Sequence, residues 1–375
     1  MKKVWITFFI GGIAGATVYL SGFGYLFKAI GKNLKKGSLT PSTDDEDKFS
    51  SREVPTQNSQ PWKKDSAYNK QALSETISEE LKKTGTSSLV VIRDNKLMHE
   101  QYWKDHNSDS LLNSFSMAKG ILSLLIGFAL DDKLIDSEDQ LVASIFPKYA
   151  ESHYGKFLTI RHLMTMQAAF DWDEEYRHPF SENSKQYFID DLAEQALNVD
   201  LKEMPGVKYE YQSVSAQLLG LILIKVTGRD LASYLSEKLW KPLEMEHSAK
   251  WSTDKKGVEK AFCCIHATTR DFAKIGQLVM QKGKWNGKQI LSQQFCKKLI
   301  TPTQENNAFC YNIWAHEDHT IPYYFFYGFL GQFIIMIREK KMVIVKTGLY
   351  NDLEVDEKKR PLQVKLLVDE LSTIF

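Results

Sequence analysis

The stretch FSMAKGILSLLIGFALDDKLI, residues 115–135, decides the fold of this 375-residue chain. It opens with Ser116-Met117-Ala118-Lys119 and is then almost wholly apolar, which predicts a buried helix over Ser116–Asp132. Positions i and i+3 share one face of a helix, so the hydroxyl of Ser116 and the amine of Lys119 are neighbours. Because burial lowers the pKa of a lysine, Lys119 can take the proton of Ser116 and make it a nucleophile.

A second Ser-x-x-Lys sequence occurs at Ser252–Lys255, so the spacing alone is not specific. This second pair lies in a polar stretch and is followed by Lys256 and Gly257. Such surroundings offer no burial that would lower the pKa of a lysine. We therefore assign the nucleophile to Ser116.

A second candidate segment follows the turn at Pro205 and ends in Tyr211-Gln212-Ser213. Side chains alternate along an extended chain, so Tyr211 and Ser213 face the same side. A phenol beside a lysine ammonium ionises more easily and relays protons. Taken alone, the pair is more typical of a packed aromatic ring and a helix cap, since the apolar helix Ser215–Thr227 follows and ends at Gly228.

The remaining periodicity places strands at both ends of the folded region and helices between them. Helices are predicted over Gln71–Lys83, Leu158–Met166, Thr269–Lys282 and Gln363–Thr373, and strands over Ser88–Arg93, Lys96–Trp103, Phe309–Ala315, Pro322–Tyr327, Gln332–Ile337 and Met342–Thr347. The two early and four late strands can form one antiparallel sheet. We therefore predict an α/β (α+β) fold, an antiparallel sheet flanked by helices with an all-helical subdomain beside it.

The composition is that of an ordinary globular protein, with a formal net charge of +1. This balance gives no reason to expect a nucleic-acid partner. The four cysteines are expected to be buried free thiols, because the adjacent pair Cys263 and Cys264 cannot easily reach disulfide geometry; a bridge involving Cys296 or Cys310 stays open. The acidic run from Asp171 to Glu175 is interpreted as a solvated loop, and no metal site is predicted.

The N-terminal part differs from the rest. Val4–Phe27 carries no charge and is long enough to span a bilayer, so we predict a membrane anchor or signal over residues 1–30. Residues 31–65 are polar and aperiodic, which indicates a linker, and residues 66–375 form the folded domain. Lysines flank both sides of the apolar run, so the sequence count does not favour export.

Five segments in a fixed order resemble serine hydrolases related to class C β-lactamases and penicillin-binding proteins, in particular the 6-aminohexanoate-dimer hydrolase group. They cover residues 115–135, 158–176, 205–235, 268–291 and 327–348. The Ser-x-x-Lys motif is typical of β-lactamases and penicillin-binding proteins. The resemblance implies a β-lactamase/transpeptidase-like fold and an extracytoplasmic, most readily periplasmic, catalytic domain.

The resemblance also implies roles for individual residues. Ser116 is acylated, and Lys119 and Tyr211 shuttle its proton. Ser213 stands where many relatives carry asparagine, and Tyr176 lies near the leaving group. No cofactor is implied.

The oxyanion hole implied by the resemblance combines the backbone N–H of Ser116 with one from Gly328-Phe329-Leu330-Gly331. Relatives carry a cation in the third motif on this strand, whereas Tyr324–Gly331 has neither lysine nor histidine. A literal Lys346-Thr347-Gly348 comes too late in the chain to be that motif. We therefore expect weak turnover of penicillins and better turnover of small uncharged esters or amides.

These features predict hydrolysis of an ester or amide through a Ser116 acyl-enzyme. Two alternatives stay open at this point. One is a non-catalytic binding or sensor protein on the same fold, favoured by the missing cation. The other is an acyltransferase that passes the acyl group to an amine instead of water.

Overall fold

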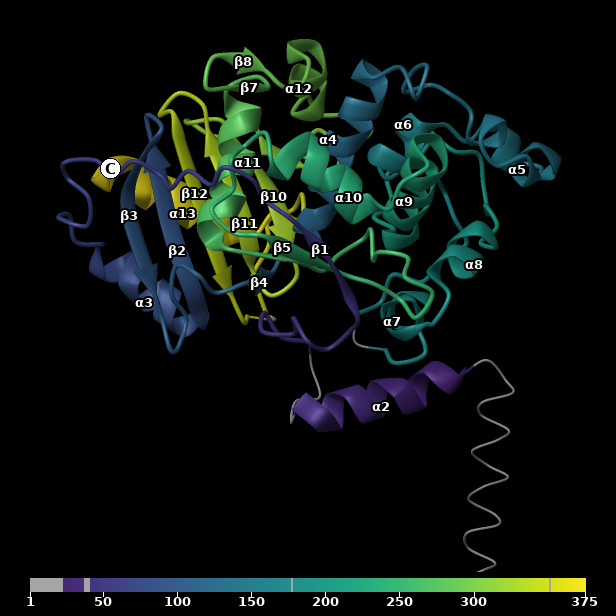
Figure 1. The fold of residues 1–375 in the computed structure, drawn as a ribbon, viewed down its shortest axis with the longest axis horizontal. Coiled ribbons are helices and arrows are strands. Elements are labelled where there is room, and N and C mark those ends of the chain that lie inside the picture. The colour runs from purple at the N-terminus through teal and green to yellow at the C-terminus, as the bar shows by residue number, and fades with distance from the viewer. Residues whose placement is uncertain (1–22, 37–40, 177, 351) are drawn as a thin grey trace, which may run out of the picture.

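The computed structural model describes residues 23–36, 41–176, 178–350 and 352–375. Its centre is a six-stranded antiparallel sheet in the order β3-β2-β12-β11-β10-β9 (Figure 1). The strands are β2 (Thr86–Arg93), β3 (Lys96–Tyr102), β9 (Trp314–His316), β10 (Tyr323–Gly328), β11 (Gln332–Ile337) and β12 (Met342–Gly348). The predicted single antiparallel sheet, built from two early and four late strands, is confirmed.

A tight turn sets the register of the first hairpin of this sheet. Asp94 and Asn95 join β2 to β3 with φ values of 48° and 62°. Asparagine and aspartate tolerate this left-handed conformation, which two-residue hairpin turns require. The first and last strands then pair directly, with Val90 opposite Val345, so the N-terminal hairpin closes against the C-terminal strands.

Helices cover both faces of the sheet. On one face lie α3 (Glu75–Lys83) and α13 (Leu362–Ile374), which bury Leu81 and Val368. On the other face lie α11 (Thr269–Met280) and α4 (Met117–Asp131). Thirteen of the fifteen residues of α4 are buried, because it is packed between the sheet and the helical subdomain.

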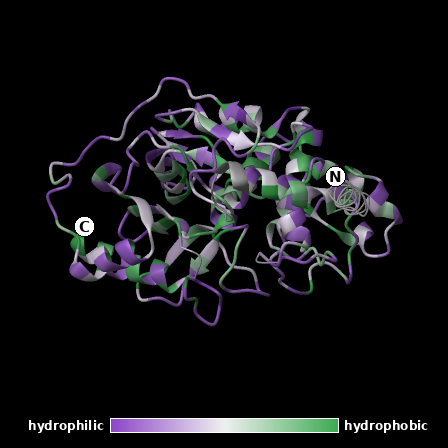
Figure 2. Ribbon diagram, turned by 90° about the horizontal axis from the view of Figure 1, so that it is seen from below, coloured by the Kyte–Doolittle hydropathy of each residue, from purple (hydrophilic) through white to green (hydrophobic). Residues whose placement is uncertain are grey.

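The helical subdomain lies beside α4 on the side away from the sheet (Figure 1). It comprises η2 (Val142–Ser144), α5 (Lys148–Glu151), η3 (Gly155–Phe157), α6 (Ile160–Met164), α7 (Glu182–Phe188), α8 (Leu192–Leu197), α9 (Ser213–Thr227), α10 (Leu231–Leu235) and η4 (Ser236–Trp240). Thr159 caps α6 and Gly228 ends α9 with a φ of 67°, as the sequence predicts. Hydrophilic residues concentrate in the outer loops (Figure 2).

A second sheet, in the order β1-β5-β6-β4, lies below α11 and corrects the linker boundary. Its strands are β1 (Ser51–Val54), β4 (Leu112–Asn113), β5 (Ala249–Ser252) and β6 (Ile265–Ala267). Because β1 pairs with β5 and Val54 is fully buried, the predicted linker over residues 31–65 contains structured chain. The sequence did not predict β1, because this strand is mostly polar and buries only one residue of four.

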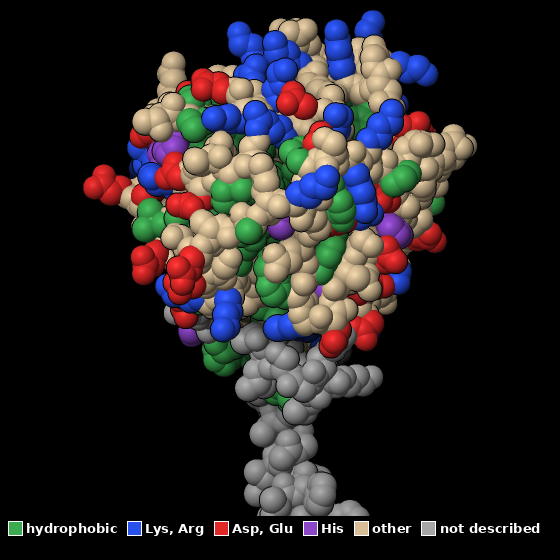
Figure 3. All heavy atoms as spheres, turned by 90° about the vertical axis from the view of Figure 1, so that its left-hand side faces the viewer, with side chains coloured by type: hydrophobic (Ala, Val, Ile, Leu, Met, Phe, Trp, Pro, Cys, Tyr) green, Lys and Arg blue, Asp and Glu red, His purple; other side chains and the backbone are tan. Residues whose placement is uncertain are grey.

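Small elements complete the upper end of the molecule. These are β7 (Lys284–Trp285), β8 (Lys288–Gln289) and α12 (Gln293–Leu299). Figure 3 shows lysine and arginine side chains gathered at this end, with acidic and basic side chains interspersed over the rest of that face. The predicted strand Phe309–Ala315 is shorter than expected, because Asn312 adopts a positive φ of 57° and interrupts it.

The cysteine prediction is wrong for one pair. Cys263 and Cys264 form a disulfide, whereas Cys296 and Cys310 are buried free thiols as predicted. Cys264 adopts a left-handed backbone conformation with a φ of 71°, so the chain reverses locally between the two side chains. Sequence adjacency alone does not reveal such a backbone.

The helix α2 (Gly24–Lys36) is the first described element and lies against α7 (Figure 1). Most of the predicted anchor over residues 1–30 lies outside the described residues. Among the residues described, no helix is both long and apolar enough to cross a membrane.

Candidate active site

The start of α4 presents Ser116 to solvent while the rest of the helix is buried. Phe115, just before it, has a φ of 42°, and its backbone N–H donates to the Asn113 side chain at 2.9 Å. A positive φ at a phenylalanine is strained and persists only where the surroundings impose it. This turn leaves Ser116 partly exposed at the helix N-terminus, the position where an accessible nucleophile is needed.

The amine of Lys119 lies beneath Ser116. Its Nζ donates to Ser116 Oγ at 2.8 Å and to the backbone oxygen of Phe262 at 3.0 Å, and the side chain is 1% exposed. Burial lowers the pKa of Lys119 to about 8, against the opposing effect of the Glu174 carboxylate. A substantial fraction is therefore neutral near pH 8 and can accept a proton from Ser116.

Tyr211 completes the group around the hydroxyl. It lies just before α9, and its ring centroid is 5.0 Å from Lys119 Nζ. Burial raises the pKa of Tyr211, and its hydrogen bond with Ser116 acts in the opposite direction. The phenol is thus protonated at neutral pH and can donate to an atom next to Ser116.

Glu174 organises the far side of the site. It accepts hydrogen bonds from the Tyr176 hydroxyl at 2.7 Å, the Ser213 N–H at 2.7 Å and the Ser213 hydroxyl at 2.5 Å. The indole of Trp172 donates to it as well, at 2.7 Å. The interpretation of this run as a solvated loop is therefore wrong for Glu174. Its carboxylate ties the loop to α9 by contacts that sequence spacing does not reveal.

The β10–β11 turn forms the wall opposite α4. The ring of Phe329 stacks on Tyr176, with centroids 5.6 Å apart, and meets Phe115 edge-on at 5.8 Å. A Cβ at Gly328 would lie 2.2 Å from the Ser114 backbone oxygen, so only glycine fits there. This close approach brings the backbone of β10 against the turn that carries Ser116.

A pocket of about 630 Å³ opens at Ser116. Its described lining residues are Tyr25, Leu26, Ala29, Pro41, Phe115, Ser116, Tyr176, Pro179, Asn183, Ser184, Tyr187, Phe188, Ser213, Phe262, Cys263, Phe329 and Asp352. No lysine or arginine occurs among these lining residues. The described part of the pocket therefore offers no cation of the kind that a carboxylate-bearing substrate usually needs.

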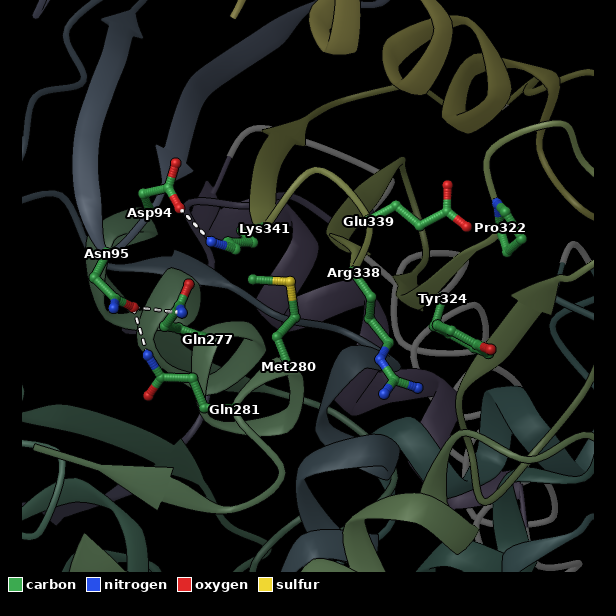
Figure 4. A pocket seen from close by; sticks show the side chains of 10 residues that line it. All are labelled: Asp94, Asn95, Gln277, Met280, Gln281, Pro322, Tyr324, Arg338, Glu339 and Lys341. Carbon is green, nitrogen blue, oxygen red and sulfur yellow. Dashed lines mark hydrogen bonds and ion pairs between the residues drawn. The ribbon is translucent and has the colours of Figure 1, made fainter. Parts of the chain in front are cut away.

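A cavity of similar size, about 610 Å³, lies at the end of the main sheet where the β2–β3 and β11–β12 turns are found (Figure 4). There Lys341 pairs with Asp94, and Gln277 and Gln281 donate to Asn95. No serine, cysteine or histidine lines it. The two cavities have similar volumes, so volume does not show which one is the active site. We place the candidate site at Ser116 because that pocket is lined by a potential nucleophile.

The structure separates Lys346 from Ser116. Lys346 is fully buried on the α3 and α13 side of the sheet, and its Nζ donates to the Gly331 backbone oxygen at 3.2 Å. β11 and β12 follow β10 as adjacent strands, in the arrangement expected if Tyr324–Gly331 is the site strand. In the second Ser-x-x-Lys sequence, Lys255 pairs with Asp190 and is mostly exposed.

Two histidines, His162 and His266, take structural positions. His162 accepts from the Thr159 backbone in the cap of α6, and His266 lies within 3.1 Å of the Ser252 hydroxyl. In the described part of the chain, no group of three or more histidine, cysteine, aspartate or glutamate residues is arranged to hold a metal ion.

Comparisons with known proteins identify relatives of this chain. The chain is 24% identical over 234 residues to the 6-aminohexanoate-dimer hydrolase of Paenarthrobacter ureafaciens, covering 60% of this chain and 59% of that protein. The chain thus matches less than two thirds of that relative's length.

Solved structures give the same fold. The structure named "Putative 6-aminohexanoate-dimer hydrolase from Bacillus anthracis" superposes with a TM-score of 0.74 at 21% identity, covering 88% of this chain and 92% of that one. FmtA from Staphylococcus aureus superposes with a TM-score of 0.61 at 15% identity, covering 85% and 94%. The beta-lactamase family model matches residues 73–368, more than half of the chain. The resemblance inferred from the five segments is confirmed, and the chain belongs to the beta-lactamase family.

Proposed function

We propose that the protein hydrolyses an uncharged ester or amide through an acyl-enzyme on Ser116. The observation that carries this proposal is the 2.8 Å contact between Lys119 Nζ and Ser116 Oγ in a site where burial lowers the lysine pKa to about 8. A neutral lysine at hydrogen-bond distance is the base that a serine nucleophile requires.

The proposed reaction has two halves. Lys119 accepts the proton of Ser116 as Oγ attacks the carbonyl carbon, and Tyr211 donates a proton to the departing oxygen or nitrogen. The Oγ–acyl bond forms and the bond to the leaving group breaks. Water then attacks the acyl-enzyme, loses a proton to the same relay and releases the acid, which restores Ser116.

Backbone donors would hold the negative charge on the carbonyl oxygen. Within the described chain, the N–H of Ser116 has no hydrogen-bond partner, and the adjacent β10–β11 turn at Phe329 offers a second donor. Such donors serve an uncharged substrate without a lysine in the third motif. This supports esters and amides over penicillins and D-Ala-D-Ala peptides, whose carboxylates need a cation.

A panel of chromogenic esters, amides and a penicillin tests the proposal, together with mass spectrometry of the trapped acyl-enzyme. We expect turnover of uncharged esters or amides and acyl mass on the peptide containing Ser116. Added amines separate hydrolysis from acyl transfer, because a transferase forms the amide product in preference to the acid. Acyl mass at another residue would contradict the assignment of Ser116.

We also propose that the N-terminal segment attaches the protein to a membrane, with the catalytic domain outside the cytoplasm. The support is the uncharged sequence from Val4 to Phe27 and the Cys263–Cys264 disulfide, since structural disulfides persist in oxidising compartments. Protease treatment of intact spheroplasts tests the side. A domain digested only after lysis would be cytoplasmic.

A further inference from the structure

The pocket at Ser116 has a wall that the catalytic domain does not supply. We propose that the space between α2 and α7 is a binding site for a long apolar acyl chain, and that the substrate is a lipid-like ester or amide taken from a membrane surface. This inference rests on the proposed function and specifies the substrate class of the same site.

The first step is how α2 is held. The Tyr25 hydroxyl donates to the Pro179 backbone oxygen at 2.8 Å, and Lys28 Nζ donates to the Phe188 backbone oxygen at 3.1 Å. Lys28 also pairs with Asp190. These contacts hold one side of α2 against the loop before α7 and against the C-terminal end of α7. The two helices are more than 140 residues apart in sequence.

The second step is the character of the channel. From α2, the side chains of Leu26 and Ala29 line the pocket, and from the end of α7 those of Tyr187 and Phe188 line it. Phe262 extends the apolar lining toward Ser116. An acyl group bonded to Ser116 Oγ can therefore lie along a mainly apolar path under α2, past the polar side chains of Asn183 and Ser184. Burying a methylene there favours binding by up to about fourfold.

The third step is the outer face of α2. Phe23, Phe27 and Ile30 recur at helical spacing and are 37%, 48% and 57% exposed. Phe180 is 53% exposed and extends this outer stripe, with its ring centroid 5.4 Å from that of Phe23. A cluster of exposed large apolar side chains marks an interaction surface.

A lipid surface is the partner that suits this outer stripe. The uncharged sequence that begins at Val4 runs directly into α2, so a membrane-bound N-terminus would hold α2 at the bilayer surface. An amphipathic helix lies in that plane with its apolar face in the lipid. The outer stripe then contacts the lipid while Leu26 and Ala29 face the pocket. This arrangement gives the acyl chain of a substrate a short route from the bilayer to Ser116.

Chain-length preference tests the acyl-chain site in the full-length protein. With soluble p-nitrophenyl esters we expect kcat/KM to be at least about tenfold higher for octanoate than for acetate. Ala29→Trp, which fills the channel, should remove most of that ratio. Gly31→Trp is the matched control on the same helix, because a Cβ placed there has no described atom within 4 Å.

The outcomes separate this inference from the proposed function. Equal kcat/KM for octanoate and acetate, or an octanoate preference untouched by Ala29→Trp, would overturn the acyl-chain site while Ser116-dependent turnover of acetate upholds the hydrolase. Labelling of Ser116 by octyl and ethyl fluorophosphonates gives a readout independent of turnover. Faster octyl labelling that Ala29→Trp abolishes would support the site.

A second arm tests the membrane source. The substrate is a long-chain ester held in phosphatidylcholine vesicles, compared with soluble octanoate ester. The double variant Phe27→Glu/Ile30→Glu should lower the ratio of vesicle turnover to soluble turnover by about tenfold, because buried charges weaken insertion of the stripe. An unchanged ratio would overturn the proposal that the substrate is taken from a membrane surface.

Discussion

The hydroxyl of Ser213 donates a 2.5 Å hydrogen bond to Glu174, whose carboxylate also receives the Tyr176 hydroxyl. One half-buried carboxylate therefore fixes the first turn of α9 and the tyrosine that stacks on Phe329. The same carboxylate stabilises the protonated form of Lys119. Glu174 thus links the position of the pocket wall to the protonation of Lys119, the proposed base.

Glu174→Gln should shift the pH dependence of the reaction. An anion raises the pKa of a nearby lysine, so its removal lowers the pKa of Lys119 from about 8. The neutral base then forms at lower pH, and the ascending limb of kcat/KM moves to lower pH. We also expect kcat to fall about tenfold, because an amide holds Tyr176 and Ser213 less well than a carboxylate.

Glu175→Gln is the matched control for this experiment. Glu175 is exposed, and its backbone N–H donates to the Asp173 carboxylate at 3.0 Å, whereas Glu174 is the carboxylate that acts on Lys119. Its pH profile should be that of the wild type. A Glu174→Gln profile that also stays in place would remove Glu174 from the control of Lys119.

Ser116→Ala should abolish turnover by at least the roughly thousandfold loss typical of removing a nucleophile. In the wild-type protein a fluorophosphonate should label Ser116 and leave Ser252 unlabelled. Ser252 is fully buried beside His266, which leaves no access for the reagent. Label found on the Ser252 peptide would refute the assignment.

Tyr211→Phe should lose most of kcat while the unfolding midpoint changes little, because only the hydroxyl that donates beside Ser116 is removed. Tyr209→Phe is a stringent control two residues away. The hydroxyl of Tyr209 is buried without a hydrogen-bond partner in the described chain, so its removal should leave kcat near the wild-type value. Equal rates for the two variants would exclude the relay role of Tyr211.

The double variant Cys263→Ser/Cys264→Ser should lower kcat about tenfold, because the disulfide holds the turn next to Phe262, whose carbonyl positions Lys119. Cys296→Ala provides the control, since Cys296 is a buried free thiol on α12. Comparison of kcat before and after a thiol reductant gives a second measurement. Full activity after complete reduction would separate the disulfide from catalysis.

The features that could be predicted from the sequence depend on short-range interactions. The pairing of Ser116 with Lys119 follows from one helical turn, and the hairpin at Asp94-Asn95 from the tolerance of these residues for positive φ. Each depends on neighbours within a few positions. Both could therefore be predicted from the chain alone.

Long-range contacts explain what the sequence conceals. The role of Glu174 depends on α9, which begins 39 residues later, and the carbonyl of Phe262 reaches Lys119 across 143 residues. The pocket wall at α2 depends on the packing of α2 against α7, which are far apart in the sequence. A polar strand such as β1 carries no apolar alternation, so only its partner β5 identifies it.

Lys346→Met should leave kcat close to the wild-type value, because Lys346 lies on the face of the sheet opposite Ser116. It should change stability in a pH-dependent way. Burial lowers the pKa of Lys346 to about 7, well below its ordinary value. Between these two values the unfolded chain binds more protons than the folded one, so this lysine makes stability rise with pH.

The methionine variant lacks that proton linkage, so its stability relative to wild type should be greatest at pH 6 and should decline toward pH 9. Urea unfolding of both proteins at these two pH values measures the difference, and the other titrating groups cancel because they are common to both. A stability difference independent of pH would mean that Lys346 keeps its ordinary pKa in the folded state. Loss of ester turnover in a stably folded Lys346→Met protein would instead tie Lys346 to catalysis, either within the active site or through its hydrogen bond to Gly331 in the β10–β11 turn.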